Sequence, residues 1–289
     1  MQNSIKKTGN GTAVLRDIET LKKNPLIIDK YASFFTDIEG RNWVKSLTEN
    51  TRNLMIDMIA VRTKIIDEYI IGFATAKFSS DEKISFNLKD NSEVSESNNL
   101  KNYQLVIVGS GFDTRAFRIN EISNFSIFEV DYSDVLALKR TIIERNKFQP
   151  ICKKHEFVSV DLSNENLTAK LLKKGFNKEI PTLWVLEAIT GYLTKEANES
   201  LFDQIKSNSV NGSSLIATFL GETEKAYGSQ DKKSHKHIYY TDSGMNLING
   251  KGWRAKQERL SDFAKLFNRN SLLEDYDYWI VYAQLFTNN

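Results

Sequence analysis

Two short apolar runs separated by a glycine turn constrain the fold of this chain more than any other feature. The first run, Leu105 to Val108, ends at Gly109-Ser110-Gly111, and the second, Phe125 to Val130, is closed by Asp131. A short β-branched run bounded by glycine is typical of a strand buried on both faces. The order of strand, glycine turn, helix, strand and acid therefore predicts an α/β sheet that binds a ligand beyond the carboxyl ends of its strands.

The glycine turn and the following acid predict a site for a nucleoside. Gly109 and Gly111 have no Cβ, so the backbone can turn sharply and a ligand can approach it closely. Asp131 stands 22 positions after Gly109, where an acidic side chain accepts hydrogen bonds from ribose hydroxyls. The alternative for Asp131 is an N-cap of the next helix, which starts near Tyr132.

The turn departs from the dinucleotide fingerprint in two ways. Ala116 and Phe117 stand where the third glycine would fall, and Asp113 lies in the opening turn, where it would repel a pyrophosphate. Both departures argue against NAD or FAD. They favour a nucleoside cofactor without phosphates, such as S-adenosylmethionine.

Several motifs resemble one protein family. The stretch Gly109-Ser110-Gly111-Phe112-Asp113-Thr114-Arg115-Ala116-Phe117-Arg118 resembles the glycine motif of the leucine carboxyl methyltransferase family, in its bacterial branch of S-adenosylmethionine-dependent O-methyltransferases. Phe128 to Asp131, with Val135 to Arg140, is similar to the second strand and next helix of that family. Further similar positions are Arg62-Thr63 with Asp67, Asp161-Leu162, and Leu186-Glu187 with Gly191-Tyr192-Leu193.

The resemblance implies a class I methyltransferase fold, an α/β Rossmann-like sheet of seven strands with an N-terminal helical cap. The seventh strand of that fold runs antiparallel between the fifth and sixth. We expect a helical cap over residues 1–78, a polar loop or insertion over 79–102 and an S-adenosylmethionine-binding core over 103–289. The cap is expected to lie over the carboxyl edge of the sheet.

Hydrophobic periodicity assigns the elements. In the N-terminal part we expect helices over 12–23, 26–35 and 51–76. The polar stretch 79–102 contains the run Ile84 to Leu88, which is a candidate edge strand. Strands and helices then alternate, with later strands expected over 156–162, 182–189, 213–220, 253–257 and 278–286, and helices over 132–147, 167–174, 195–207 and 261–267.

Composition excludes several classes of protein. The formal net charge is only +2, from 39 basic and 37 acidic residues, so there is no electrostatic case for nucleic acid. The single Cys152 excludes an internal disulfide and a multi-cysteine zinc site. The first ten residues lack the apolar stretch of a signal peptide, and no apolar run is long enough to span a membrane. We expect a cytoplasmic protein with no bound metal; its oligomeric state cannot be predicted.

Acidic residues near the ends of later strands complete the expected cofactor site. Asp161 is expected to accept a hydrogen bond from the adenine amino group, and Leu162 to contribute its backbone amide; a turn aspartate is the alternative. Glu187 is expected near the ammonium of the methionine part, with a structural pair to a lysine as the alternative. By the resemblance, Arg62 holds the carboxylate of the methionine part, unless it lies on a solvated helix face.

Other basic and aromatic residues have weaker roles in this interpretation. Arg16 is a second candidate for the carboxylate, and Arg115 is expected to brace the Asp113 turn. Tyr192, His235 and His237 are expected in the acceptor pocket. The two histidines are candidate bases for a hydroxyl acceptor, or solvated loop residues.

The predicted function is an S-adenosylmethionine-dependent O-methyltransferase that methylates a carboxylate or hydroxyl of a small molecule or peptide terminus by direct SN2 transfer. The phosphatase-methylating branch of the family does not carry Asp-Thr-Arg-Ala-Phe-Arg in this form, so a phosphatase C-terminus is not the expected acceptor. The alternatives are a tRNA-modifying carboxyl methyltransferase relative, a nucleotide-dependent oxidoreductase, and a binding module without activity.

Overall fold

A computed structural model describes residues 2–75, 102–223, 237–249, 252–269 and 277–285, with side chains from residue 9 onward. Within these ranges no helix combines the length and the apolar composition needed to cross a lipid bilayer. The polar stretch 79–102, with the candidate strand Ile84 to Leu88, lies outside the described residues except for its last residue.

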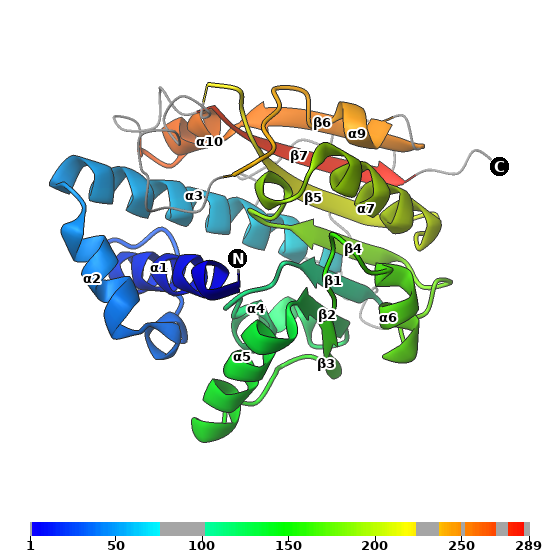
Figure 1. Cartoon of the computed structure of the whole chain (residues 1–289), viewed down its shortest axis with the longest axis horizontal. Coiled ribbons are helices and arrows are strands. Elements are labelled where there is room, and N and C mark those ends of the chain that lie inside the picture. Colours follow the sequence, from blue (N-terminus) through cyan, green and yellow to red (C-terminus); the bar gives the residue numbers. More distant parts are fainter. Residues whose placement is uncertain (1, 76–101, 224–236, 250–251, 270–276, 286–289) are drawn as a thin grey trace.

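In the described part of the chain, seven strands form one sheet in the order β3-β2-β1-β4-β5-β7-β6 (Figure 1). The strands are β1 (Gln104–Val108), β2 (Ser126–Asp131), β3 (Lys154–Ser159), β4 (Thr182–Leu186), β5 (Ser214–Leu220), β6 (Trp253–Arg259) and β7 (Tyr278–Leu285). Neighbours from β3 to β5 are parallel, and β7 is antiparallel to both β5 and β6. The predicted fold class, with an antiparallel seventh strand between the fifth and sixth, is confirmed.

The central strand β1 shows why its sequence is apolar throughout. All five of its residues are buried. Leu105 and Ile107 belong to the core on one face of the sheet, whereas Val106 and Val108 belong to the core on the other. Because helices cover both faces, a strand in the middle of the sheet has no solvent-facing side.

The helices divide between the two faces. The first face is covered by α3 (Glu49–Ala74), α4 (Arg115–Arg118), the 3₁₀ helix η3 (Asn120–Ile122), α5 (Ser133–Arg145) and α10 (Leu260–Leu266). The second face is covered by α6 (Leu167–Lys173), α7 (Lys195–Ser207) and α9 (Asn246–Asn249). A short 3₁₀ helix, η4 (Thr190–Tyr192), follows β4.

Helix α3 belongs both to the sheet core and to the N-terminal helical layer. Its later turns, with Ile65, Tyr69 and Phe73, are buried in the core on the first face of the sheet. Its earlier turns, with Ile56 and Ile59, pack on α1 (Gln2–Thr20) and α2 (Ile38–Ser46). The N-terminal helices lie beside the carboxyl edge of the sheet (Figure 1), and α3 packs against both.

The prediction for the chain between Pro25 and Ser46 was wrong. Only a 3₁₀ turn, η1 (Ala32–Phe35), forms in the stretch expected as a helix over 26–35. The buried Asp29 accepts hydrogen bonds from the N–H groups of Tyr31 and Ala32, which hold the chain in a turn. Helix α2, which was not predicted, begins after Asp37, whose carboxylate accepts the N–H of Gly40.

Two strands end earlier than expected. β3 ends at Ser159, so Asp161 and Leu162 lie in the turn that follows. β4 ends at Leu186, and the chain then turns at Ala188, which has a positive φ of 55°. Glu187 therefore comes directly after the strand and projects at its carboxyl end.

Candidate functional site

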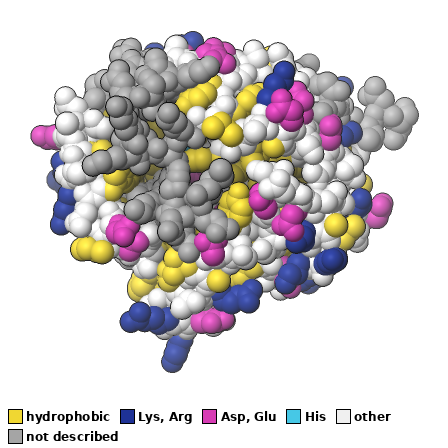
Figure 2. Space-filling model, in the orientation of Figure 1, with side chains coloured by type: hydrophobic (Ala, Val, Ile, Leu, Met, Phe, Trp, Pro, Cys, Tyr) yellow, Lys and Arg dark blue, Asp and Glu magenta, His cyan; other side chains and the backbone are white. Residues whose placement is uncertain are grey.

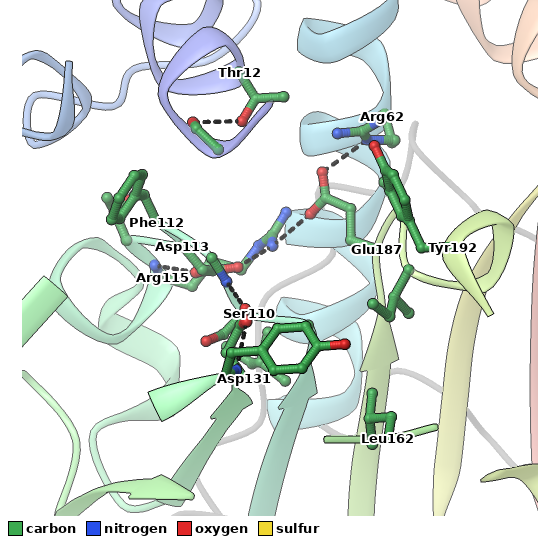
Figure 3. A pocket seen from close by; sticks show the side chains of 18 of the residues that line it. Thr12, Arg62, Ser110, Phe112, Asp113, Arg115, Asp131, Leu162, Glu187 and Tyr192 are labelled. Atoms are coloured by element: carbon green, nitrogen blue, oxygen red, sulfur yellow. Dashed lines mark hydrogen bonds and ion pairs between the residues drawn. The ribbon is translucent and has the colours of Figure 1, made fainter. Parts of the chain in front are cut away.

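A cavity of about 310 Å³ lies at the carboxyl ends of β1, β2 and β4 (Figure 3). Helices α1 and α3 close it from the other side with Thr12, Arg16 and Arg62. The volume is at the lower end of the range of roughly 300–1,000 Å³ that small-molecule sites occupy. The predicted site residues that line it are Arg16, Arg62, Gly109, Ser110, Gly111, Asp113, Asp131, Tyr132, Leu162, Glu187 and Tyr192.

The glycine turn forms the part of the wall next to β1. Gly109 and Gly111 have positive φ values of 70° and 46°, which favour glycine. A Cβ at Gly109 would lie 2.9 Å from the side chain of Ile189, whereas a Cβ at Gly111 would enter open space. Since Gly111 lines the cavity, a ligand can reach its backbone without meeting a side chain.

Asp131 ends β2 and faces this turn. Its Oδ2 accepts the N–H of Gly111 at 2.7 Å, and its Oδ1 accepts the N–H of Tyr132 at 2.7 Å. Burial raises the pKa of Asp131, and these two backbone donors oppose the shift. Each carboxylate oxygen can accept a second hydrogen bond. Helix α5 has Tyr132 at its cap position, so the alternative of Asp131 as the N-cap is wrong.

Two buried hydroxyl groups in the cavity wall have no hydrogen-bond partner among the described residues. They are Oγ1 of Thr63, which is 1% exposed, and Oγ of Ser110, which is 6% exposed. A buried polar group left unpaired costs about 1–3 kcal/mol. These hydroxyls therefore indicate a polar ligand. Thr63 was not predicted as a ligand residue, although its place beside Arg62 in the family motif could have revealed it.

Glu187 lies between two arginines at the carboxyl end of β4 (Figure 3). Its Oε1 accepts Nε of Arg62 at 2.8 Å, and its Oε2 accepts Nη1 of Arg115 at 2.8 Å. Burial alone would raise the pKa of Glu187, but Arg115 and Arg62 outweigh it and hold the pKa far below its ordinary value. The alternative of a lysine partner for Glu187 is wrong, because its partners are arginines.

Arg62 is buried, so the alternative of a solvated helix face is wrong. It is 5% exposed, and its Nη1 donates to the hydroxyl of Tyr278 at 3.2 Å. Its guanidinium also lies 5.7 Å from the centre of the Tyr278 ring. These contacts hold Arg62 in the cavity wall, beside Glu187.

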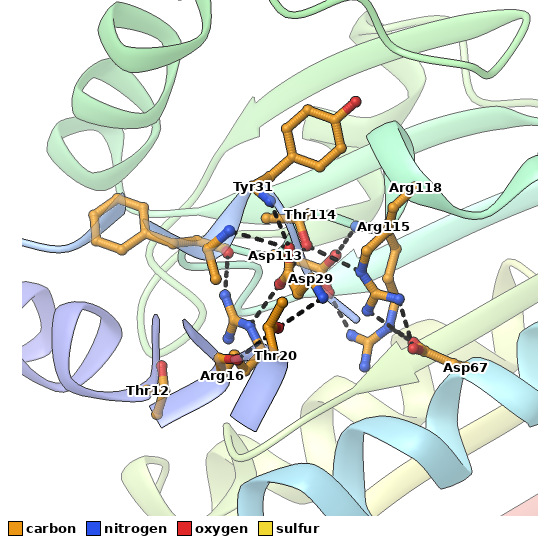
Figure 4. A network of polar contacts seen from close by, with 12 residues as sticks. Thr12, Arg16, Thr20, Asp29, Tyr31, Asp67, Asp113, Thr114, Arg115 and Arg118 are labelled. Atoms are coloured by element: carbon orange, nitrogen blue, oxygen red, sulfur yellow. Dashed lines mark hydrogen bonds and ion pairs between the residues drawn. The ribbon is translucent and has the colours of Figure 1, made fainter. Parts of the chain in front are cut away.

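Arg115 connects the glycine turn to α3 (Figure 4) and, through Glu187, to the end of β4 (Figure 3). Besides Glu187, it donates to Asp67 at 2.7 Å and to the carboxylate of Asp113. Arg118, one turn further on, holds Asp67 with two hydrogen bonds of 2.6 and 3.0 Å. Arg115 thus braces the Asp113 turn as expected, and in addition lines the cavity.

Arg16 extends the same network onto α1. Its Nε lies 2.9 Å from Oδ2 of Asp29, and its Nη2 donates to the carbonyl of Phe112 at 2.8 Å. Asp29 also accepts a hydrogen bond of 2.8 Å from Thr114. Burial would raise the pKa of Asp29, but Arg16 and Arg118 hold it below its ordinary value. Arg16 therefore ties the N-terminal helix to the glycine turn.

The charges around the cavity do not cancel. Four arginines, Arg16, Arg62, Arg115 and Arg118, line it. They stand against five carboxylates, three of which line the cavity while two lie behind it: Asp113, Asp131, Glu187, Asp29 and Asp67. With all these groups ionised, the site carries one negative charge in excess.

Asp161 does not line the cavity. Its carboxylate accepts the N–H of Ser163 at 3.0 Å and the side-chain amide of Asn164 at 2.9 Å, within its own turn. The hydroxyl of Tyr132 lies 3.4 Å from Oδ1 of Asp161. Leu162, the next residue, does line the cavity. The turn-aspartate alternative thus describes the contacts of Asp161 in this structure, and its role toward adenine stays a prediction.

The expected acceptor side of the cavity is aromatic. Tyr192 lines it, and the ring of His237 lies behind Tyr192 with the ring centres 4.6 Å apart. His237 itself does not line the cavity, but the neighbouring Ile238 does, and His235 lies outside the described residues. Among the described residues, no group of three His, Cys, Asp or Glu side chains is arranged to hold a metal ion.

Comparisons with known proteins find methyltransferases. The family model of leucine carboxyl methyltransferase matches residues 92–206. A protein of Mycobacterium marinum, named "Putative S-adenosyl-L-methionine-dependent methyltransferase", is 31% identical over 214 residues, which cover 70% of this chain and 61% of the relative. A Mycobacterium bovis BCG protein of the same name is 27% identical over 291 residues, which cover 92% of this chain and 82% of the relative.

This chain thus spans about three fifths of the length of the M. marinum relative. The crystal structure of a "putative methyltransferase" from Thermobifida fusca shares the fold, with a TM-score of 0.59 and 12% identity over 95% of this chain and 94% of that one. The glycine turn and Asp131 fall within residues 92–206, the part of the chain that matches the leucine carboxyl methyltransferase family.

Proposed function

We propose that this protein is a methyltransferase that binds S-adenosylmethionine and methylates an oxygen atom of a small molecule or a peptide terminus. The observation that carries the proposal is the position of Asp131. Its buried carboxylate is fixed by the Gly111 and Tyr132 N–H groups beside an open glycine turn. That arrangement suits the two hydroxyls of a ribose.

The described residues fit the nucleoside part of this cofactor. Asp131 accepts the ribose hydroxyls, and the unpaired hydroxyl groups of Ser110 and Thr63 supply further polar contacts. Leu162 presents its backbone to the adenine, with Asp161 as the expected acceptor for the adenine amino group. The bare backbone at Gly111 lets the ligand lie against the turn.

The charge of the site also fits. Of the residues that line the cavity, Glu187 would hold the ammonium of the methionine part, and Arg62 would hold its carboxylate, with Arg16 as the second candidate cation. At neutral pH the donor has a sulfonium, an ammonium and a carboxylate, which leaves it one positive charge. The site has one carboxylate more than arginines, so donor and site are complementary.

The reaction asks little of the protein beyond alignment. When bound, the sulfonium would supply an activated methyl group; in one SN2 step the oxygen–methyl bond would form as the sulfur–methyl bond breaks, with S-adenosylhomocysteine as the leaving group. Helix α1 and the aromatic side of the cavity, with Thr12, Phe112 and Tyr192, position the acceptor and exclude water. A carboxylate acceptor is already ionised at neutral pH, whereas a hydroxyl acceptor needs a base.

The oxidoreductase alternative is disfavoured by one contact. Asp113 uses its Oδ1 to accept the N–H of Arg115 at 2.7 Å, at the start of α4. In dinucleotide-binding proteins the first turn of this helix binds the pyrophosphate. Here a carboxylate of the chain already occupies that turn, and it would repel phosphate.

Binding measurements test the cofactor. Isothermal titration with S-adenosylhomocysteine should show saturable binding, and NAD should show none under the same conditions. Tight binding of NAD with no binding of S-adenosylhomocysteine would refute the proposal and support the oxidoreductase alternative. Neither result would depend on knowing the acceptor.

Transfer of labelled methyl groups tests the reaction. Matched sets of carboxylate and phenol acceptors, including peptides with a free C-terminus, should reveal an O-methylated product. A carboxylate acceptor should react at a rate that changes little above about pH 5, whereas the rate with a phenol should rise with pH. Methylation of transfer RNA alone would favour the tRNA-modifying alternative, and cofactor binding without transfer to any acceptor class would favour the silent module.

A further inference from the structure

A second cavity, of about 330 Å³, lies outside the edge strand β3. We call it the basic groove. Four cations line it, together with two serines and an apolar floor: Arg140, Lys170, Lys173, Lys174, Ser133, Ser159, Leu136, Ala137, Phe157 and Val158. Figure 2 shows lysine and arginine side chains gathered along the lower part of the visible face, over the region of α5 and α6.

The cations stand on both sides of the sheet edge. The guanidinium of Arg140, on α5, lies over the ring of Phe157, at 5.4 Å from the ring centre. The next residue, Val158, belongs to the core that contains Leu167 and Leu171 of α6. Because successive residues of a strand point to opposite faces, α5 borders the groove on one face of β3 and α6 borders it on the other.

Half of these four cations are not paired with a carboxylate in the described structure. Among the described contacts, Arg140 and Lys173 have no carboxylate partner. Lys174 lies 3.7 Å from Glu156, and Lys170 lies 2.5 Å from Glu165. Both pairs are partly exposed, and pairs of this kind contribute about 0–1 kcal/mol. The lysines can therefore exchange these partners for others at little cost.

The other edge of the sheet is built differently. β6 carries charges on the strand itself, with Arg254, Lys256 and Glu258 exposed on alternate positions. Charged side chains on an edge strand prevent other chains from pairing with it. The half of β3 that borders the basic groove, Phe157 to Ser159, has no charge. Its cations come from the flanking helices, and among the described residues β3 pairs with no strand other than β2.

We propose that the basic groove binds an extended acidic peptide segment that adds to the sheet beside β3. The backbone of the added segment pairs with the open edge of β3, as in other cases of strand addition. Its side chains alternate between the two faces, so acidic residues meet Arg140 on one side and the lysines of α6 on the other. This site is separate from the cofactor cavity and does not depend on the proposed reaction.

A fluorescently labelled peptide in which pairs of glutamates alternate with pairs of valines places glutamates on both faces of a strand, and tests the proposal by fluorescence anisotropy with the full chain. We expect saturable binding that weakens as salt is added. Lys173→Glu should weaken it at least tenfold, whereas Lys195→Glu, a matched change at an exposed lysine of α7, should change it less than twofold. Hydrogen exchange of the wild-type chain should slow in β3 when the peptide binds.

Two further probes separate strand addition from charge alone. The same peptide with alternate backbone amides methylated cannot pair with β3 and should bind at least tenfold more weakly. Equal binding of the methylated peptide, equal losses in the two lysine variants, or no saturable binding would overturn the proposal. Displacement of the peptide by an oligothymidylate strand at lower concentration would assign the groove to nucleic acid and overturn it as well.

Discussion

The cofactor cavity and the basic groove are separate, but neighbouring residues near the carboxyl end of β3 line them: Val160 lines the first and Ser159 lines the second. Their volumes are similar, but their charges are arranged in opposite ways. In the cofactor cavity every arginine contacts a carboxylate of the chain, and all four are largely buried. In the basic groove the cations are partly or fully exposed, and two lack a carboxylate partner in the described structure.

The difference shows what each kind of charge can do. Buried ion pairs fix their partners in one geometry, because removing one member leaves a charge without compensation in a poorly solvated place. The network from Arg16 to Glu187 therefore fixes the positions of α1, α3, the glycine turn and β4 relative to one another around the cavity. Exposed cations cost little to leave unpaired, since water and salt screen them. They remain free to recognise a partner.

The largest expected effect is on the buried network. Asp67→Asn should lower the free energy of unfolding by about 3–5 kcal/mol, because Arg115 and Arg118 lose a shared carboxylate. The control is Glu68→Gln, in the next position of α3, where a partly exposed carboxylate pairs with Lys64; it should cost less than about 0.5 kcal/mol. Urea unfolding measures both. Equal costs would mean that the network does not stabilise the cavity.

The next effect concerns binding. Arg62→Ala should weaken the binding of S-adenosylhomocysteine by about 2–3 kcal/mol, the size of a lost hydrogen bond between charged groups. Titration calorimetry measures it, with Arg41→Ala on the exposed surface of α2 as the control. A loss below about 0.5 kcal/mol would remove Arg62 from the proposed cofactor site and leave it as a structural partner of Glu187.

Stability should also depend on pH through Glu187. Its pKa is lower in the folded chain than in the unfolded chain, so the unfolded state takes up a proton first as the pH falls. The stabilisation is therefore fully present above about pH 5 and is lost as the pH falls below the ordinary glutamate pKa of about 4.3. The total loss is about 1.4 kcal/mol for each pH unit by which the pKa of the unfolded chain exceeds that of the folded chain. Asp131, whose pKa is raised, has the opposite effect on the pH dependence of stability.

Urea unfolding between about pH 7 and pH 3 checks the sign of the Glu187 effect. Glu187→Gln should show a smaller loss of stability in acid than the wild type, and Glu199→Gln, at an exposed position of α7, should follow the wild type. A Glu187→Gln curve parallel to the wild type would contradict the assignment.

The smallest expected effect is in the basic groove. Lys173→Glu should change the free energy of unfolding by less than about 0.5 kcal/mol, because the side chain is exposed and makes no described ion pair. Urea unfolding again measures it. A loss of more than about 1.5 kcal/mol would show that the groove cations serve the fold, and would remove the contrast between the two cavities.

Features that depend on neighbouring residues in the chain were predictable. The strands around the glycine turn and the place of Asp131 follow from short apolar runs, glycines and spacing, whereas the antiparallel last strand was implied by the family resemblance. The boundaries of the third and fourth strands were less certain, because Val160 and Leu162 continue the apolar pattern although the chain has already turned.

Features that depend on long-range packing were not predictable. Asp29 reads as an ordinary loop aspartate, yet it contacts Arg16 and Thr114 across the molecule. Thr63 sits in the middle of a helix, where hydrophobic periodicity does not mark the cavity; only its place beside Arg62 in the family motif does. The basic groove joins α5, β3 and α6, and its cations are scattered along the chain, so the balanced total charge conceals them.

The central claim is that a buried carboxylate at the end of β2 holds the ribose of S-adenosylmethionine. Calorimetric titration of S-adenosylhomocysteine into the wild type and Asp131→Ala tests it most directly, with circular dichroism to check that the variant is folded. The wild type should bind and the variant should bind at least about a hundredfold more weakly, since two hydrogen bonds to a charged group are lost. Unchanged affinity in a folded variant would contradict the account.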